Sequence, residues 1–365
     1  AMQPPRFPVS PLATADVPGD RLSQWYRRFV DTRSSDAAER VLATALNGEP
    51  DLHDVETMML AAVTDHVFVD EGHTLDFTNK AFELVEHVGE DASRDILTSL
   101  VGQTARAARH EEESAWRHPH DLAGLLRRVA EELPERLANV ARRRHGIGVA
   151  ATRALADVVH AADDPVEVVA ALDGAVDAGA GDEELGRAVA FAASLRIVHF
   201  HTSSDHGDWD VVHHAFTHAN ALYCCIVRAP SPELLRGVYH AALKVYLDRF
   251  LNVPAARLPE VTGAGGLDGL AACFEAEGRV DEAGGIVYSF LRGGGGAAEV
   301  VARLGAALCA EDAGFHWFQT YEAAVRQHRT WPSGSEEEAL VLVGATRFLA
   351  AHTPTRRELS QVVRI

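Results

Sequence analysis

Histidines gather in one short segment of this chain. The twenty residues HFHTSSDHGDWDVVHHAFTH contain six of them. Imidazole titrates near neutral pH and is the commonest protein ligand for transition metals, so this density indicates a site that handles a metal ion or protons. The six are His199, His201, His206, His213, His214 and His218, and His240 follows one predicted helix later.

Within this segment, His214 and His218 lie four residues apart in a stretch with helical periodicity. Side chains at i and i+4 share one face of a helix, which presents both imidazoles to one metal ion. Neutral imidazoles suit iron, zinc, copper or nickel, and carboxylates can complete the shell. His201, His206 and Asp205 lie on the turn before this helix, so we expect them to reach its first turns.

A shorter segment upstream, DHVFVDEGHTLDFTNKAFELVEH, contains His66 and His73. The motif His-x-x-x-Asp-x-Gly that begins at His66 aligns without gaps on the same motif beginning at His201, and a weaker relative covers residues 312–316. In the first two copies an Ala-rich helical stretch precedes the motif and another follows it. Stacked helix–turn–helix units form an α-solenoid or a closed helical bundle, so we expect a fold with internal pseudo-repeats.

These patterns predict one site to which both copies contribute. We expect Asp205 and Asp208 to orient the imidazole N–H groups or to complete the coordination. The candidate catalytic residues are His206, His240 and Asp205. The candidate metal ligands are His66, His73, His201, His206, His214, His218 and His240.

Two other interpretations of the histidines stay open, namely acid–base catalysis without a metal and purely structural hydrogen bonding. The chain shows no His-Glu-x-x-His, no Cys-x-x-Cys and no Gly-x-Ser-x-Gly elbow. It also shows no flavin, NAD or P-loop nucleotide motif. The sequence therefore favours a transition metal over an organic cofactor.

Helical periodicity extends over most of the chain. Apolar residues recur at three- and four-residue spacing in segments rich in Ala, Leu, Glu and Arg, which predicts roughly fifteen helices, no substantial sheet and an all-α fold. The predicted parts are an extended Pro-rich arm (1–34), a first helical half (35–180) and a second half with the His-rich site (181–365), the halves forming one compact unit. An irregular loop at 252–266 is expected to lie over a surface or an opening. Helix caps are expected at Ser35 or Asp36, Asp51, Asp121, Asp164 and Ser231.

Composition restricts the partners. The chain has 365 residues, 47% of them hydrophobic, and a formal net charge of −19. This acidity argues against nucleic acid or an anionic membrane as a partner, because both are bound through clustered Lys and Arg. No apolar run approaches the roughly 18 residues that span a bilayer, and the four cysteines show no disulfide spacing. We therefore expect a cytoplasmic protein that acts on a small molecule.

Four stretches resemble known proteins: GHTLDFTNKAFELVEH, WRHPHDL, DWDVVHHAFTHANAL and YLDRFLNVP. They are similar to the His-rich helical region of actinobacterial Rieske-associated proteins and, more distantly, to the questin oxidase-like family, over residues 35–355. The resemblance implies oxygen-dependent chemistry on aromatic molecules. A Rieske cluster needs Cys-x-His and Cys-x-x-His pairs, which this chain lacks. Electrons would therefore come from a separate electron-transfer protein, or the chain lacks a C-terminal domain beyond ELSQVVRI.

Our hypothesis from the sequence is a metal-dependent oxidoreductase or oxygenase of the non-haem iron type, acting on a small apolar or aromatic molecule. The alternative is an acidic helical-repeat interaction module with structural or pH-sensing histidines. A third possibility is a metal-independent enzyme with a histidine as general base, which would stay active after chelation.

Overall fold

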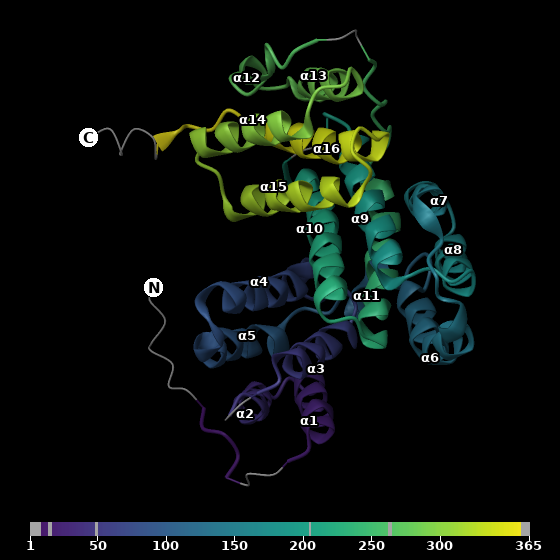
Figure 1. Ribbon diagram of the computed structural model, residues 1–365, viewed down its shortest axis with the longest axis vertical. Helices are drawn as coiled ribbons and strands as arrows, with labels where there is room; N and C mark the ends of the chain where they lie inside the picture. The colour runs from purple at the N-terminus through teal and green to yellow at the C-terminus, as the bar shows by residue number, and fades with distance from the viewer. Residues whose placement is uncertain (1–8, 14–16, 48–49, 204–205, 262–264, 359–365) are drawn as a thin grey trace. The chain divides into compact units, whose positions relative to one another are not determined.

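The described part of the chain consists of helices and connecting turns (Figure 1). The structure is a computed structural model and describes residues 9–13, 17–47, 50–203, 206–261 and 265–358. Those residues form sixteen α-helices and no strand. The all-α fold predicted from the helical periodicity is confirmed, whereas the internal-repeat arrangement stays a prediction.

The chain divides into two compact units. Unit 1 comprises residues 1–135 and 224–240, and unit 2 comprises residues 136–223 and 241–365. The sequence predicts two helical halves that follow one another along the chain, with the boundary at residue 180. Each unit instead combines two chain segments, because the boundaries fall within α10 (His206–Arg228) and α11 (Pro232–Asp248).

Unit 1 is built on five helices that share one apolar core. They are α1 (Gly19–Asp31), α2 (Ser35–Ala45), α3 (Leu52–Thr64), α4 (His73–Val88) and α5 (Ser93–Arg106). α1 packs on α2 and α3, while α5 packs on α2 and α4. Tyr26, Leu42, Met59, Phe82 and Val101 are buried in this core. Most of α6 (Leu122–Val140) also belongs to unit 1.

The predicted N-terminal arm contains a helix. Leu22, Tyr26 and Val30 recur at four-residue spacing and bury their side chains in the core of unit 1. Because that spacing gives α1 one apolar stripe, packing holds these residues in a helix. The extended arm predicted over residues 1–34 is therefore wrong for residues 19–31.

At the centre of unit 2 lie two deeply buried helices, α9 (Asp182–Val198) and α16 (Glu336–His352). α16 contacts α9, α13, α14 and α15, and α9 also contacts α7. Helices that are buried on all sides belong to the centre of a large domain, which is where α9 and α16 lie. Unit 2 also contains the first part of α10, short parts of α6 and α11, and the whole of α7 (Gly148–Ala161), α8 (Pro165–Asp177), α12 (Leu270–Cys273), α13 (Val280–Arg292), α14 (Ala297–Ala310) and α15 (Phe315–Gln327).

Four predicted helix caps are confirmed. Asp51, Asp121, Asp164 and Ser231 each accept a hydrogen bond from a backbone N–H in the first turn of the following helix, at 2.9 to 3.2 Å. These bonds satisfy donors that would otherwise lack an intrahelical acceptor. Of the described helices, none combines the length and the apolar character that crossing a lipid bilayer requires.

Candidate metal centre

The first half of α10 places a carboxylate and two imidazoles close together. Asp210 and His213 are three residues apart, so their side chains lie on the same side of the helix. His214 follows directly, and the ring centroids of His213 and His214 are 4.3 Å apart. His213 and His214 are buried, whereas Asp210 is half-buried.

A third imidazole reaches this cluster from α15. The ring centroid of His316, in the first turn of α15, lies 4.7 Å from that of His213 and 4.7 Å from that of His214. The Nε2 atoms of His214 and His316 are 3.3 Å apart. One ligand atom each from Asp210, His213 and His316 falls within 4.8 Å of the other two. Two helices of unit 2 thus bring one carboxylate and three imidazoles to one spot.

The surroundings of His213 fix its orientation. Its Nδ1 lies 3.3 Å from the hydroxyl oxygen of Thr320 on α15, and its ring packs against Phe348 on α16 with centroids 5.1 Å apart. When the Nδ1–H donates to Thr320, the Nε2 atom keeps its lone pair. Such outer hydrogen bonds are the usual way in which proteins orient a metal-binding histidine.

Another histidine, His352 at the end of α16, lies close to the Asp210 carboxylate. Its Nδ1 lies 2.7 Å from the carbonyl oxygen of Phe348, and its Nε2 lies 3.8 Å from a carboxylate oxygen of Asp210. The His352 ring also packs against Trp317, with centroids 5.5 Å apart. When both ring nitrogens carry a proton, His352 is therefore placed to attract the Asp210 carboxylate without joining the three imidazoles.

The donor set fits a transition metal. Two ligands that each lie about 2.1 Å from an ion are at most about 4.2 Å apart. Donor atoms within 4.8 Å of one another lie near this upper limit, and side-chain rotation would have to bring them to the roughly 3 Å that separates adjacent ligands of one ion. Imidazole nitrogen with carboxylate oxygen suits iron, zinc or copper better than magnesium or calcium, which prefer all-oxygen shells.

Three of the predicted ligands, His66, His73 and His240, belong to unit 1. His66 Nδ1 lies 2.8 Å from a carboxylate oxygen of Glu111, which also accepts a backbone hydrogen bond from Val67. His73 is the first residue of α4, and its Nδ1 lies 2.8 Å from the Asp70 carbonyl oxygen. His240 is buried on α11. The predicted convergence of His66 and His73 with the His-rich segment stays a prediction.

Of the predicted residues in unit 2, only His214 lies in the cluster of described side chains. His201 lies on the loop after α9, with Nδ1 2.6 Å from the Ser203 hydroxyl, and it lines a separate cavity. His218 is buried one turn beyond His214 on α10. His206 begins α10 with its side chain outside the described part, and Asp205 lies outside the described residues.

Three members of the cluster were not among the predicted ligands: Asp210, His213 and His316. The spacing Asp-x-x-His-His carried a signal for the first two, because positions i and i+3 share a helix face. His316 stands in the weak third relative of the repeat, at residues 312–316. The pairing of His214 with His316 joins positions 102 residues apart, and helical periodicity does not specify such a contact.

Comparison of this chain with protein-family models, with curated proteins and with solved structures gives no match. The resemblance described above is therefore neither supported nor contradicted by a known relative.

Proposed function

We propose that this chain is a metal-dependent oxidoreductase whose metal centre is formed by Asp210, His213 and His316. The observation that carries the proposal is the convergence of these three donors within 4.8 Å, with His214 Nε2 only 3.3 Å from His316 Nε2. Side chains that merely filled a core would not need a carboxylate and three imidazoles at one point.

The ligand set favours iron. Two histidines and one carboxylate, with the remaining positions open, form the ligand set of non-haem Fe(II) oxygenases. Iron held in this way would supply the activation of dioxygen for the oxidation of a small apolar or aromatic molecule. Imidazole also suits zinc and copper, so the identity of the metal is the first quantity to measure.

The protein residues around the cluster have distinct tasks in this proposal. Asp210, His213 and His316 bind the ion, and Thr320 orients His213 through its Nδ1. His214 is placed to hold a proton between its Nε2 and that of His316, or to act as a further ligand. Phe348 packs on the buried His213 ring and helps to exclude water from that side.

Metal analysis of the full chain tests the proposal. The protein is purified without added metal, reconstituted anaerobically with Fe(II), desalted and measured by mass spectrometry of the elements. We expect about one ion per chain in the parent and in His145→Gln, a control that changes an exposed histidine of unit 2. The triple variant Asp210→Asn, His213→Gln, His316→Gln should retain almost none.

Two further measurements separate an oxidoreductase from a structural metal site. Nitric oxide added to the Fe(II)-loaded protein should give the EPR signal of ferrous iron with an open position. Oxygen uptake with a reductant and a panel of phenols should exceed that of the triple variant. Substoichiometric metal after reconstitution would overturn the metal centre. Full occupancy without the EPR signal or oxygen uptake would keep the metal centre and overturn the oxidative function.

A further inference from the structure

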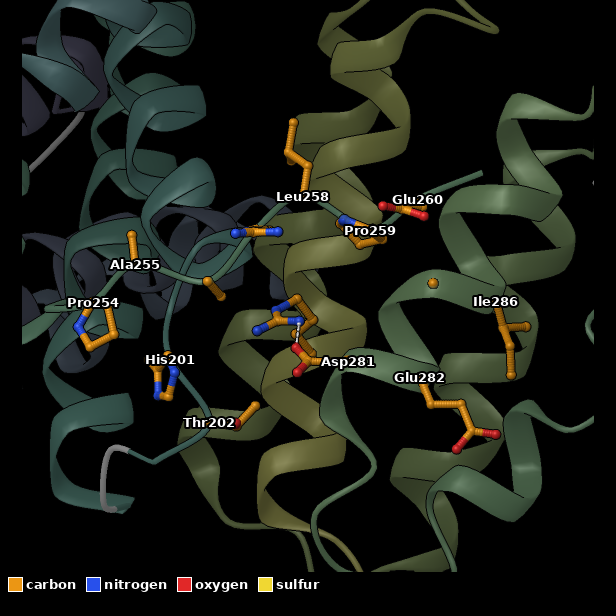
Figure 2. A pocket seen from close by; sticks show the side chains of 14 residues that line it. His201, Thr202, Pro254, Ala255, Leu258, Pro259, Glu260, Asp281, Glu282 and Ile286 are labelled. Atoms are coloured by element: carbon orange, nitrogen blue, oxygen red, sulfur yellow. Dashed lines mark hydrogen bonds and ion pairs between the residues drawn. The ribbon is translucent and has the colours of Figure 1, made fainter. Parts of the chain in front are cut away.

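The irregular loop that the sequence places over an opening does line a cavity. Residues 254–260 border a space of about 780 Å³ within unit 2, together with α13, α16 and the turn after α9 (Figure 2). The prediction that this loop lies over a surface or an opening is confirmed for residues 254–260. Ligand pockets for small molecules typically have volumes of about 300 to 1,000 Å³, so this cavity has the size of a binding site.

Apolar groups form much of the wall. Figure 2 shows Pro254, Ala255, Leu258 and Pro259 along the loop and Ile286 on the facing side of the cavity, on α13. Loops that carry apolar residues over an open space leave those residues partly hydrated. A ligand with an apolar body would release that water, which favours binding.

A buried arginine lies at this cavity. The side chain of Arg347 on α16 is 1% exposed, and it donates to the Phe200 carbonyl at 2.8 Å and to the Asp281 carboxylate at 2.5 Å. Its Nε is buried and has no hydrogen-bond partner within the described residues. Asp281 is 70% exposed, so solvent weakens this ion pair, the one that Arg347 makes among the described residues. A buried donor without an acceptor is costly, and an oxyanion in the cavity would satisfy it once a local shift of the loop exposes Nε.

A second arginine borders the same cavity. Arg257 lies on the loop, is exposed, and makes no ion pair with any described residue. The nearby acidic groups differ in availability, because Glu282 is already bonded to Arg279 at 2.7 Å, whereas Glu260 has no ion pair with a described residue. The Glu260 carboxylate beside the two arginines repels ligands with several negative charges. A ligand with one negative charge is therefore favoured.

We propose that this cavity binds a small apolar monocarboxylic acid. The carboxylate lies between Arg257 and the Nε of Arg347, and the hydrocarbon body lies against Leu258, Pro259 and Ile286. Guanidinium groups suit this role because their donors match the geometry of a carboxylate. Gly284 makes the arrangement possible, since a Cβ there would lie 3.1 Å from the Cγ of Arg347.

The cavity is separate from the histidine cluster. Arg347 and Phe348 are neighbours on α16, so their side chains leave the helix in different directions. Arg347 lines the cavity, while Phe348 packs on His213. The proposal therefore does not depend on the presence of a metal, and either function can fail without the other.

Calorimetric titration of the full chain with octanoate and with 3-phenylpropionate tests the proposal. The primary amide of each acid serves as an uncharged probe. Both acids should bind, and the amides should bind at least about tenfold more weakly, because a charge-assisted hydrogen bond is lost. Arg257→Gln should weaken the acids by a similar factor. Arg292→Gln, an exposed arginine outside the cavity, is the matched control and should bind like the parent.

A second variant tests the location independently of charge. Ile286→Trp fills the apolar side of the cavity and should weaken acids and amides alike, while circular dichroism confirms that the variant is folded. Absence of binding by both acids at millimolar concentration would overturn the proposal. Equal binding of acids and amides, or unchanged binding in Arg257→Gln, would also overturn it, since the arginines would then recognise nothing.

Discussion

Binding of a metal at the cluster in unit 2 should raise the melting temperature of that unit. The ligands lie on two different helices, with Asp210 and His213 on α10 and His316 on α15. An ion that binds all three holds the two helices together in the folded state. The unfolded chain does not bring these residues together, so the ion binds the folded state preferentially.

The expected size follows from mass action. At a free metal concentration one hundred times the dissociation constant, preferential binding adds about 2.7 kcal/mol to the free energy of unfolding. For a unit of about 200 residues, each kcal/mol raises the melting temperature by about 2 to 4 °C. We therefore expect an increase of about 5 to 10 °C on saturation with Fe(II), or with Co(II) as an air-stable substitute.

Differential scanning calorimetry of the apo and the metal-saturated protein measures this increase. His316→Gln removes the donor on α15 and should reduce the increase to within about 1 °C, because the remaining donors all lie on α10. His145→Gln should keep the full increase. The reasoning would be refuted by an increase that survives in His316→Gln, since the metal would then bind elsewhere.

Three further predictions follow from the described contacts. His352→Ala should weaken metal binding by about 10- to 100-fold while the fold persists, because His352 steers Asp210 from outside the ligand set. Burial, aided by nearby cationic groups, lowers the pKa of His160 to about 3, so the folded protein keeps it neutral while the unfolded chain protonates it below pH 6.5. The stabilisation by neutral His160 is therefore complete above pH 6.5 and is lost as pH falls. Urea unfolding should show that the free energy of unfolding decreases by about 2 kcal/mol between neutral pH and pH 5. His160→Phe should lack this pH-dependent decrease. Glu184 accepts hydrogen bonds from three backbone N–H groups, so Glu184→Gln should lower the free energy of unfolding by about 1 to 3 kcal/mol in the same assay, and an unchanged value would contradict this assignment.

The sequence predicts local structure better than it predicts the site. Helical periodicity and the caps at Asp51 and Ser231 depend on neighbouring residues, so one segment contains all the information that they require. The contact between His214 and His316 depends on which faces of α10 and α15 meet. Packing of whole helices decides that question. His218 is predicted as the partner of His214 because the two are four residues apart on one helix. Such spacing does not identify a partner on a different helix.

One last prediction concerns α16, the helix that borders both proposed sites. Arg347 at the cavity and Phe348 at the histidine cluster are adjacent, so a shift or rotation of α16 would move both. α16 is buried along most of its length, and a closely packed interior resists such a shift. We therefore expect the two sites to bind their ligands independently.

A thermodynamic cycle measures this independence. The affinity for octanoate is determined with and without bound metal, and the affinity for metal is determined with and without octanoate. Independent sites should give coupling below about 0.5 kcal/mol, the range in which distant sites add. Linkage requires the same coupling in both directions, which provides an internal check. Coupling clearly above that limit, abolished by His316→Gln, would show that α16 moves on ligand binding and would contradict the rigid packing argued here.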